Sequence, residues 1–150
     1  MKIGIGSDDA GFELKGMIDK FVQELGHTVV DFGPITQDPV DYPDVALAVA
    51  GAIQHHSIER GILICGTGIG MCIAANKVTG VWAALAHDTY SAERARKSNN
   101  AQVITLGARV VGPELAKSII KTFLESEFQG GNSTQKVAKI ASYEGQTFPL

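Results

Sequence analysis

Short runs of apolar residues alternate along the chain with longer segments in which apolar residues recur at helical spacing. Glycine, proline or aspartate stands at the junctions, a pattern typical of repeated strand and helix units on a parallel sheet. The short runs predict five strands, at residues 2–7, 28–32, 61–65, 81–86 and 103–106. The expected fold class is therefore α/β, with a five-stranded parallel, doubly wound sheet.

The segments between these strands predict helices with one apolar face. Between the first two strands, Met17 is expected to face the core and Lys15 to lie on the charged side. Residues 44–56 and 113–127 show the same pattern. A short last helix is expected from residue 132 or 133 to 140, because either residue could cap it.

Composition narrows the class of protein. With 150 residues, 45% apolar and 19% charged, the chain is expected to form one globular domain over residues 1–150. A net charge of −3, with basic residues scattered among acidic ones, argues against nucleic-acid binding. No apolar run approaches the roughly 18 residues of a transmembrane helix, and no signal peptide is visible. We therefore expect a cytoplasmic protein without a membrane partner.

The candidate binding and catalytic residues are those that come directly after the predicted strands, because ligands of doubly wound sheets bind beyond the carboxyl ends of the strands. Asp8 and Asp9 follow the first strand and are expected to face the end of the third, where they could bind hydroxyl groups or cap a helix. His87 and Asp88 follow the fourth strand as ligand groups or as a cap. Arg109 follows the fifth strand.

A glycine-rich turn follows the third strand, with the sequence Gly66-Thr67-Gly68-Ile69-Gly70. Three glycines at alternate positions let backbone N–H groups point at a ligand, which predicts an anion site; the alternative is only a tight turn. It is not a P-loop, because no Gly-Lys-Ser/Thr follows. A dinucleotide site with Asp31 as ribose ligand is rejected, because Asp8 and Asp9 stand where the pyrophosphate would approach.

Cys65 lies where the apolar third strand meets this turn. Nearby N–H dipoles favour the thiolate, so a reactive thiol is preferred over an inert buried cysteine. Cys72 is expected in the core. The spacing of the two cysteines matches neither a zinc knuckle nor a redox pair, and no cluster of His, Cys, Asp or Glu has metal-ligand spacing, so no metal is expected.

Several motifs occur together in one protein family: Asp8, Asp41-Tyr42-Pro43, Ile64-Cys65-Gly66-Thr67-Gly68-Ile69-Gly70, Ala74-Ala75-Asn76-Lys77, Asn99-Asn100 and Gly107-Ala108-Arg109-Val110-Val111-Gly112. In this combination, the chain resembles ribose-5-phosphate isomerase B and the related galactose-6-phosphate isomerases over nearly its whole length. The segment from His87 to Gln102 also resembles the erythrulose-4-phosphate isomerase branch of the family.

The resemblance implies a three-layer α/β/α sandwich with a Rossmann-like sheet. It implies an aldose–ketose isomerase of phosphorylated sugars that works through an enediol(ate), without metal or cofactor. It also implies active sites shared between two subunits, and therefore a homodimer or a dimer of dimers. The tail, about residues 128–150, is expected to pack on the partner subunit.

The resemblance also implies roles for single residues. Cys65 would be the general base that moves the proton between C1 and C2. Thr67 and the amides of Gly66–Gly70 would bind the developing enediolate oxygen, assisted by Asn99 from the other subunit. The other substrate-binding positions are Asp8 and Asp9 for the hydroxyls, Tyr42 and Ile69 for the pocket wall, and Arg109 for the phosphate.

Three features depart from the ribose enzymes. Asp9 stands where they usually have histidine, and Ser98 occupies the catalytic position of a histidine thought to open the furanose ring. Their tail Gly-Gly-Arg-His-x-x-Arg places two arginines on the phosphate, and this chain has Asn132 and Lys136 at those positions. A tetrose 4-phosphate cannot close to a furanose because its O4 is esterified, so a ring-opening acid would be superfluous for it.

Several functions remain open at this stage. Ribose 5-phosphate is the family default, erythrose 4-phosphate is a second candidate, and a subunit of a six-carbon phosphate isomerase is a third. From a different class, the chain could be a non-catalytic partner subunit or a sugar-phosphate-binding module, although retention of Cys65, Thr67 and Asn99 speaks against it. A nucleotide-binding flavodoxin-like domain is disfavoured.

Overall fold

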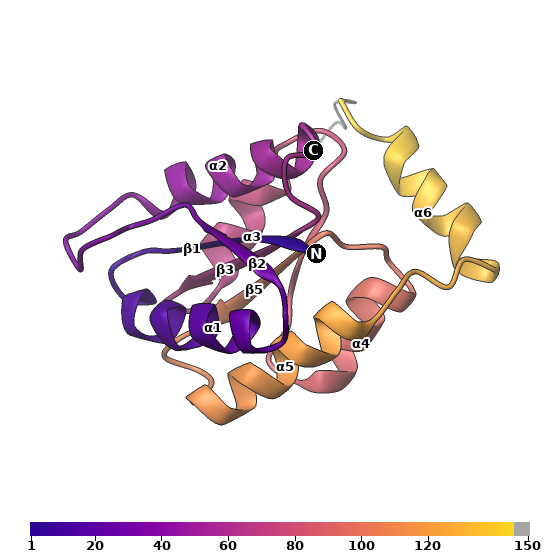
Figure 1. The fold of residues 1–150 in the computed structure, drawn as a ribbon. Coiled ribbons are helices and arrows are strands. Elements are labelled where there is room, and N and C mark those ends of the chain that lie inside the picture. Colours follow the sequence, from indigo (N-terminus) through magenta and orange to yellow (C-terminus); the bar gives the residue numbers. More distant parts are fainter. Residues whose placement is uncertain (146–150) are drawn as a thin grey trace.

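A five-stranded sheet forms the centre of the computed structural model, which describes residues 1–145 (Figure 1). Its strands are β1 (Lys2–Ser7), β2 (Thr28–Asp31), β3 (Arg60–Cys65), β4 (Ala83–Leu85) and β5 (Val103–Gly107). They lie in the order β2-β1-β3-β5-β4, and every neighbouring pair is parallel. The helices are α1 (Phe12–Glu24), α2 (Tyr42–Gln54), α3 (Ile69–Ala75), α4 (Thr89–Lys97), α5 (Pro113–Glu125) and α6 (Asn132–Ser142).

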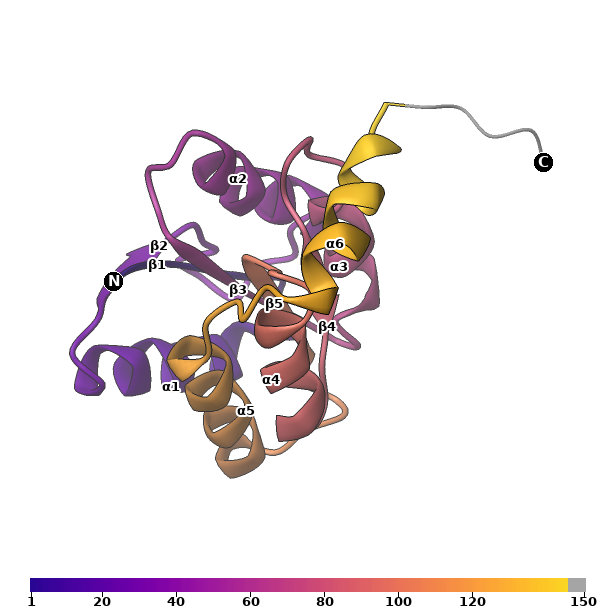
Figure 2. The ribbon, with the colours of Figure 1, turned by 90° about the vertical axis from the view of Figure 1, so that its right-hand side faces the viewer.

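Helices cover both faces of the sheet, which confirms the predicted α/β/α sandwich (Figure 2). Helices α1, α4 and α5 pack on one face, and α2 and α3 on the other. Successive strand side chains point to opposite faces. In β3, Ile62 and Ile64 therefore join the first core, and Leu63 and Cys65 join the second. This alternation turns Cys65 toward α2 and α3.

Two elements differ from their expected bounds. Helix α2 begins at Tyr42 and not at residue 44, because Pro43 occupies the first turn, where a helix tolerates proline. Strand β4 covers only three residues and not 81–86. Just before β4 begins, the backbone N–H of Trp82 donates to the side-chain oxygen Oε1 of Gln102 at 2.8 Å, in place of a backbone carbonyl.

Lys15 is buried, which corrects its expected place on the charged side of α1. Its exposure is 4%, whereas Met17, expected in the core, is 45% exposed. The Lys15 ammonium donates to both carboxylate oxygens of Asp31, at 2.8 and 2.7 Å, and to the Pro34 carbonyl at 2.7 Å. The apolar stem packs in the protein while the charged head finds an anionic partner at the end of β2.

Replacing Lys15 by methionine is expected to lower the free energy of unfolding. The variant loses three charge-assisted hydrogen bonds, but the partly exposed Asp31 carboxylate can be hydrated, so we expect a cost of about 2 kcal/mol. Lys20→Met, at an exposed position of the same helix, is the matched control and should change stability by less than about 0.5 kcal/mol. Urea unfolding followed by circular dichroism measures both, and equal costs would contradict this role of Lys15.

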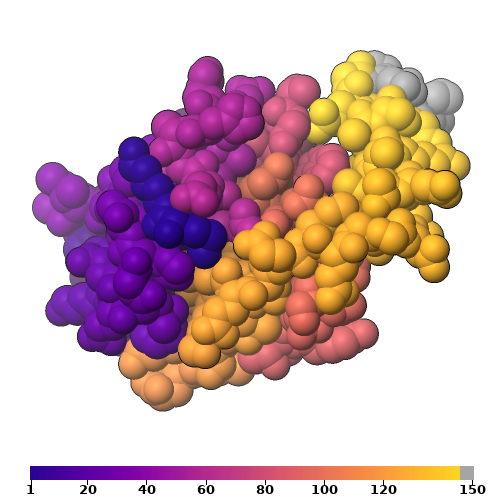
Figure 3. Space-filling view, turned by 45° about the vertical axis from the view of Figure 1, so that its right-hand side comes forward, coloured from indigo at the N-terminus to yellow at the C-terminus, as the bar shows by residue number. Residues whose placement is uncertain are grey.

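The chain after α5 leaves the body of the molecule at the amino edge of the sheet. Helix α6 lies on that side, away from the carboxyl ends of the strands, and projects in the space-filling view (Figures 1 and 3). Val137 is its only buried residue. Within residues 1–145, no helix is both long and apolar enough to cross a bilayer.

Candidate active site

A hollow of about 440 Å³ lies at the carboxyl edge of the sheet, beside the ends of β1, β3 and β5. We call it the carboxyl-edge hollow. Its lining residues are Asp8, Tyr42, Cys65, Gly66, Thr67, Ile69, Gly70, Ile73 and Arg109. The sequence singled out all of these except Ile73. Ile73 lies four residues after Ile69 and both are exposed on α3, a helical spacing that could have found it.

Cys65 ends β3 and is 5% exposed. The backbone N–H of Gly68 donates to Cys65 Sγ at 3.0 Å, and such a donor stabilises negative charge on the sulfur. The contact forms because the turn folds back over the strand end, with Gly68 at φ +79°. A Cβ at Gly68 would lie 2.6 Å from Leu85 Cδ1 and 2.8 Å from the carbonyl carbon of Leu106. Both the backbone conformation and the lack of space therefore require glycine.

Arg109 places a cation beside the glycine-rich turn. Its backbone N–H donates to the Gly66 carbonyl at 3.1 Å. Its guanidinium lies so near that Nη1 would be 3.4 Å from a Cβ at Gly66. Thr67 is exposed on the same turn, and its Oγ1 accepts from Ile69 N at 3.4 Å. Backbone donors, a hydroxyl and a guanidinium thus surround one small space, which suits an anionic ligand.

Tyr42 and Asp8 form the remaining walls. The ring of Tyr42 packs on Gly70, where a Cβ would lie 2.5 Å from the ring carbon Cε2. Asp8 Oδ1 accepts from Gly11 N at 2.9 Å, so this carboxylate both caps the turn before α1 and lines the hollow. Asp9 does not line the hollow, and its proposed contact with substrate is therefore not supported by the geometry of the single chain.

The His87 and Asp88 pair makes two different structural contacts. Asp88 caps α4, since its Oδ1 accepts from Ser91 N at 2.7 Å. Hydrogen bonding from Ser91 lowers the pKa of Asp88 below its ordinary value. His87 Nε2 accepts from Gly107 N at 3.0 Å, which joins the ends of β4 and β5. The structure therefore supports the cap interpretation for Asp88.

Cys72 is half-buried, which corrects its expected place in the core. Its Sγ donates to the Ala83 carbonyl at 3.4 Å. Burial raises the pKa of the Cys72 thiol above its ordinary value. Cys72 Sγ also accepts from Asn76 Nδ2 at 3.6 Å, so both sulfurs have an N–H donor, but only Cys65 lines the carboxyl-edge hollow.

Four predicted site residues lie away from the carboxyl-edge hollow of their own chain. Ser98 and Asn99 follow α4, which begins at the carboxyl edge and returns to the amino edge before β5. Asn132 and Lys136 are exposed on α6, on the amino side (Figures 1 and 2). A single chain does not bring these four residues together with Cys65.

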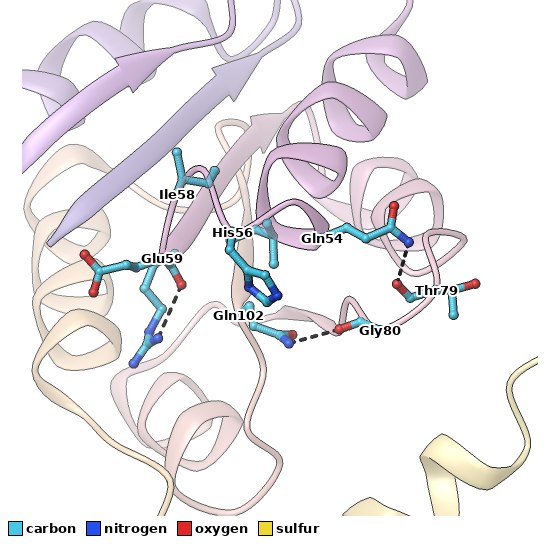
Figure 4. A pocket seen from close by; sticks show the side chains of 9 residues that line it. Gln54, His56, Ile58, Glu59, Thr79, Gly80 and Gln102 are labelled. Carbon is cyan, nitrogen blue, oxygen red and sulfur yellow. Dashed lines mark hydrogen bonds between the residues drawn. The ribbon is translucent and has the colours of Figure 1, made fainter.

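A second hollow, of about 470 Å³, lies at the amino edge of the sheet (Figure 4). Two glutamine side chains that line it bond to the protein itself. Gln54 donates to the Thr79 carbonyl at 2.9 Å, and Gln102 to the Gly80 carbonyl at 3.1 Å. No residue predicted to bind substrate lines it. Within residues 1–145, no group of three or more His, Cys, Asp or Glu side chains is placed to hold a metal ion.

A model of the ribose/galactose isomerase family matches residues 3–140. The chain belongs to the ribose/galactose isomerase family. Among its relatives in this family, D-erythrulose-4-phosphate isomerase of Pectobacterium atrosepticum is 58% identical, with 97% of each chain covered. Ribose-5-phosphate isomerase B of Escherichia coli is 42% identical, over 95% of this chain and 96% of its own.

Solved structures of the ribose/galactose isomerase family share the fold. Ribose-5-phosphate isomerase B of Clostridium thermocellum has a TM-score of 0.94 at 49% identity, with 96% of this chain and 97% of that chain covered. The Mycoplasma genitalium enzyme, solved with bound ribulose-5-phosphate, has a TM-score of 0.93 at 42% identity, with 97% of each chain covered. The suspected family and its Rossmann-like fold are thus confirmed.

Proposed function

We propose that the protein is a cofactor-independent aldose–ketose isomerase of phosphorylated sugars that works through an enediol(ate). The observation that carries this proposal is the 3.0 Å contact from Gly68 N to Cys65 Sγ, in a hollow that also contains Arg109. Proton abstraction beside a carbonyl needs a base together with donors for the oxygen that gains charge. Arg109 adds a cation for the phosphate.

In the proposed mechanism, the thiolate of Cys65 removes the proton from C2 of the open-chain aldose. The electrons of the C–H bond form the C1–C2 double bond, and O1 becomes the enediolate oxygen. Thr67 and the amides of Gly66–Gly70 stabilise this oxygen. The thiol then returns the proton to C1 while the O2 proton moves to O1, which gives the ketose. Asp8 orients the hydroxyl groups by accepting their hydrogen bonds.

A second copy of the chain completes the proposed site, in a homodimer or a dimer of dimers. Asn99, Asn132 and Lys136 lie on the amino side of their own chain, so they can reach a carboxyl-edge hollow only from another copy. Helix α6 supports this arrangement, because it projects from the body and Ile140 on it is 55% exposed. Residues 128–145 of the tail would pack on the partner, with Lys136 near the phosphate, and residues 146–150 lie outside the described part of the chain.

Ribose 5-phosphate is the substrate that we propose first, as expected from the named ribose enzymes among the relatives. Erythrose 4-phosphate is the second candidate, because Ser98 replaces a ring-opening histidine and a relative at 58% identity is named D-erythrulose-4-phosphate isomerase. A role as one subunit of a six-carbon phosphate isomerase, or as a non-catalytic binding module, predicts no turnover by the purified chain alone.

A substrate panel tests these alternatives. The purified protein is given ribose 5-phosphate, erythrose 4-phosphate, allose 6-phosphate or galactose 6-phosphate, and isomerisation is followed by NMR. The highest kcat/KM is expected for ribose 5-phosphate, which would show that Ser98 is tolerated. Turnover of the tetrose phosphate alone would assign an acyclic substrate instead. Binding without turnover of any member would contradict the proposed activity.

A further inference from the structure

The ladder between β4 and β5 ends in a side chain at the carboxyl edge. Ala86 N donates to the Thr105 carbonyl at 3.2 Å, as expected of parallel strands. Two residues further along β5, the N–H group of Gly107 donates to Nε2 of His87 at 3.0 Å. The imidazole therefore takes the place of a backbone acceptor in the last position before the strands separate.

Gly107 lies directly under the proposed anion-binding turn. It is buried, and a Cβ at this position would lie 2.8 Å from both the carbonyl carbon and the oxygen of Thr67. Its carbonyl accepts from Val110 N at 2.9 Å, which closes the turn that carries Arg109. A displacement of Gly107 would thus be transmitted to Thr67 and to Arg109 at once.

Hydrogen bonds hold the turn that carries Arg109 from two sides. On the β3 side, Ala108 N donates to the Cys65 carbonyl at 2.8 Å, and Arg109 N to the Gly66 carbonyl at 3.1 Å. On the β4 side, His87 holds Gly107. We infer that His87 is a positioning residue, which fixes Arg109 and Thr67 through the N–H of Gly107. The inference rests on the proposed function, in which these two residues bind the substrate.

The contact also fixes the proton on the imidazole ring. A backbone N–H can only donate, so Nε2 of His87 must present its lone pair, and the ring proton of the neutral imidazole lies on Nδ1. Glutamine could replace this acceptor with its amide oxygen. Alanine could not, and the buried N–H of Gly107 would then move to find another partner.

Kinetics of His87→Ala and His87→Gln test the inference. Displacement of Arg109 by His87→Ala is expected to raise KM for the sugar phosphate and the inhibition constant of inorganic phosphate about tenfold each, and displacement of Thr67 is expected to lower kcat about tenfold. His87→Gln should stay within about threefold of the wild type for all three constants. The matched control is His55→Ala, at an exposed position in the amino-edge part of the molecule, which should change none of them. Unchanged constants in His87→Ala, or equal losses in both His87 variants, would overturn the role.

Two measurements that need no turnover keep the inference separate from the proposed activity, and the first of them, on the wild type, does not depend on folding of a variant. Nitrogen-15 NMR of the His87 ring should show a protonated Nδ1 and an unprotonated Nε2. Calorimetric titration with inorganic phosphate should show about tenfold weaker binding by His87→Ala than by the wild type. A proton on Nε2, or equal phosphate affinity of the two proteins, would contradict the inference. If both expected results are obtained but the protein isomerises no sugar phosphate, only the proposed function is contradicted.

Discussion

Replacing Cys65 by alanine is expected to lower kcat of sugar-phosphate isomerisation by at least about 10²-fold, because the variant lacks the proposed base. KM should change little, since Arg109 and the amides of the turn remain. Removing the thiol from a nearly buried position at the end of β3 is also expected to preserve the fold. Steady-state rates, together with the circular dichroism spectrum, measure both effects.

Cys72→Ala is the matched control for this experiment. Cys72 lies on α3, within seven residues of Cys65, but it does not line the carboxyl-edge hollow. Its kcat should stay within about threefold of the wild type. Retained activity in Cys65→Ala, or an equal loss in the two variants, would rule out Cys65 as the base.

Gly68→Ala is expected to have the second large effect, on both stability and activity. A Cβ there meets the backbone of Leu106 at 2.8 Å, on a residue whose φ is +79°. The strained backbone costs about 1–2 kcal/mol and the overlap about 1–3 kcal/mol more. Relief of the overlap moves the N–H away from Cys65 Sγ and displaces the donors of the turn. We therefore expect kcat to fall by about 10²-fold as well.

Gly80→Ala separates these two causes. Gly80 has the same φ of +79°, but nothing lies within 4 Å of its added Cβ. It should therefore show only the cost of the backbone conformation, about 1–2 kcal/mol, and keep its activity. Denaturant unfolding and steady-state kinetics on both variants make the comparison. Equal behaviour of the two alanine variants would show that the close contact at Gly68 does not shape the site.

The strands and the carboxyl-edge residues could be predicted because the sequence encodes them locally. Apolar runs bounded by glycine or aspartate gave the strand positions, and parallel pairing then placed Asp8, Cys65 and Arg109 at one edge. The burial of Lys15 could not be predicted in this way. It depends on Asp31, a partner on β2 whose position only the packed structure defines.

Contacts between distant segments, or between subunits, account for the other features that the sequence pattern does not predict. The bond from Gly107 to His87 joins two strand ends through a side chain, and no local spacing indicates it. Asn99, Asn132 and Lys136 were selected by resemblance. In their own chain they lie just after α4 and on α6, and α6 is on the amino side. Their proposed contact with substrate depends on a second subunit, which the pattern of one sequence does not place.

Isomerisation in D₂O tests the central claim most directly. Because the carboxyl-edge hollow is open at the surface, the proton held by Cys65 is expected to exchange with solvent during the lifetime of the enediolate. We predict that NMR will show deuterium at C1 of the ketose formed by the wild type, and neither ketose nor exchange above background with Cys65→Ala. Ketose that forms without any deuterium at C1, as a direct hydride shift requires, would contradict the proposed mechanism.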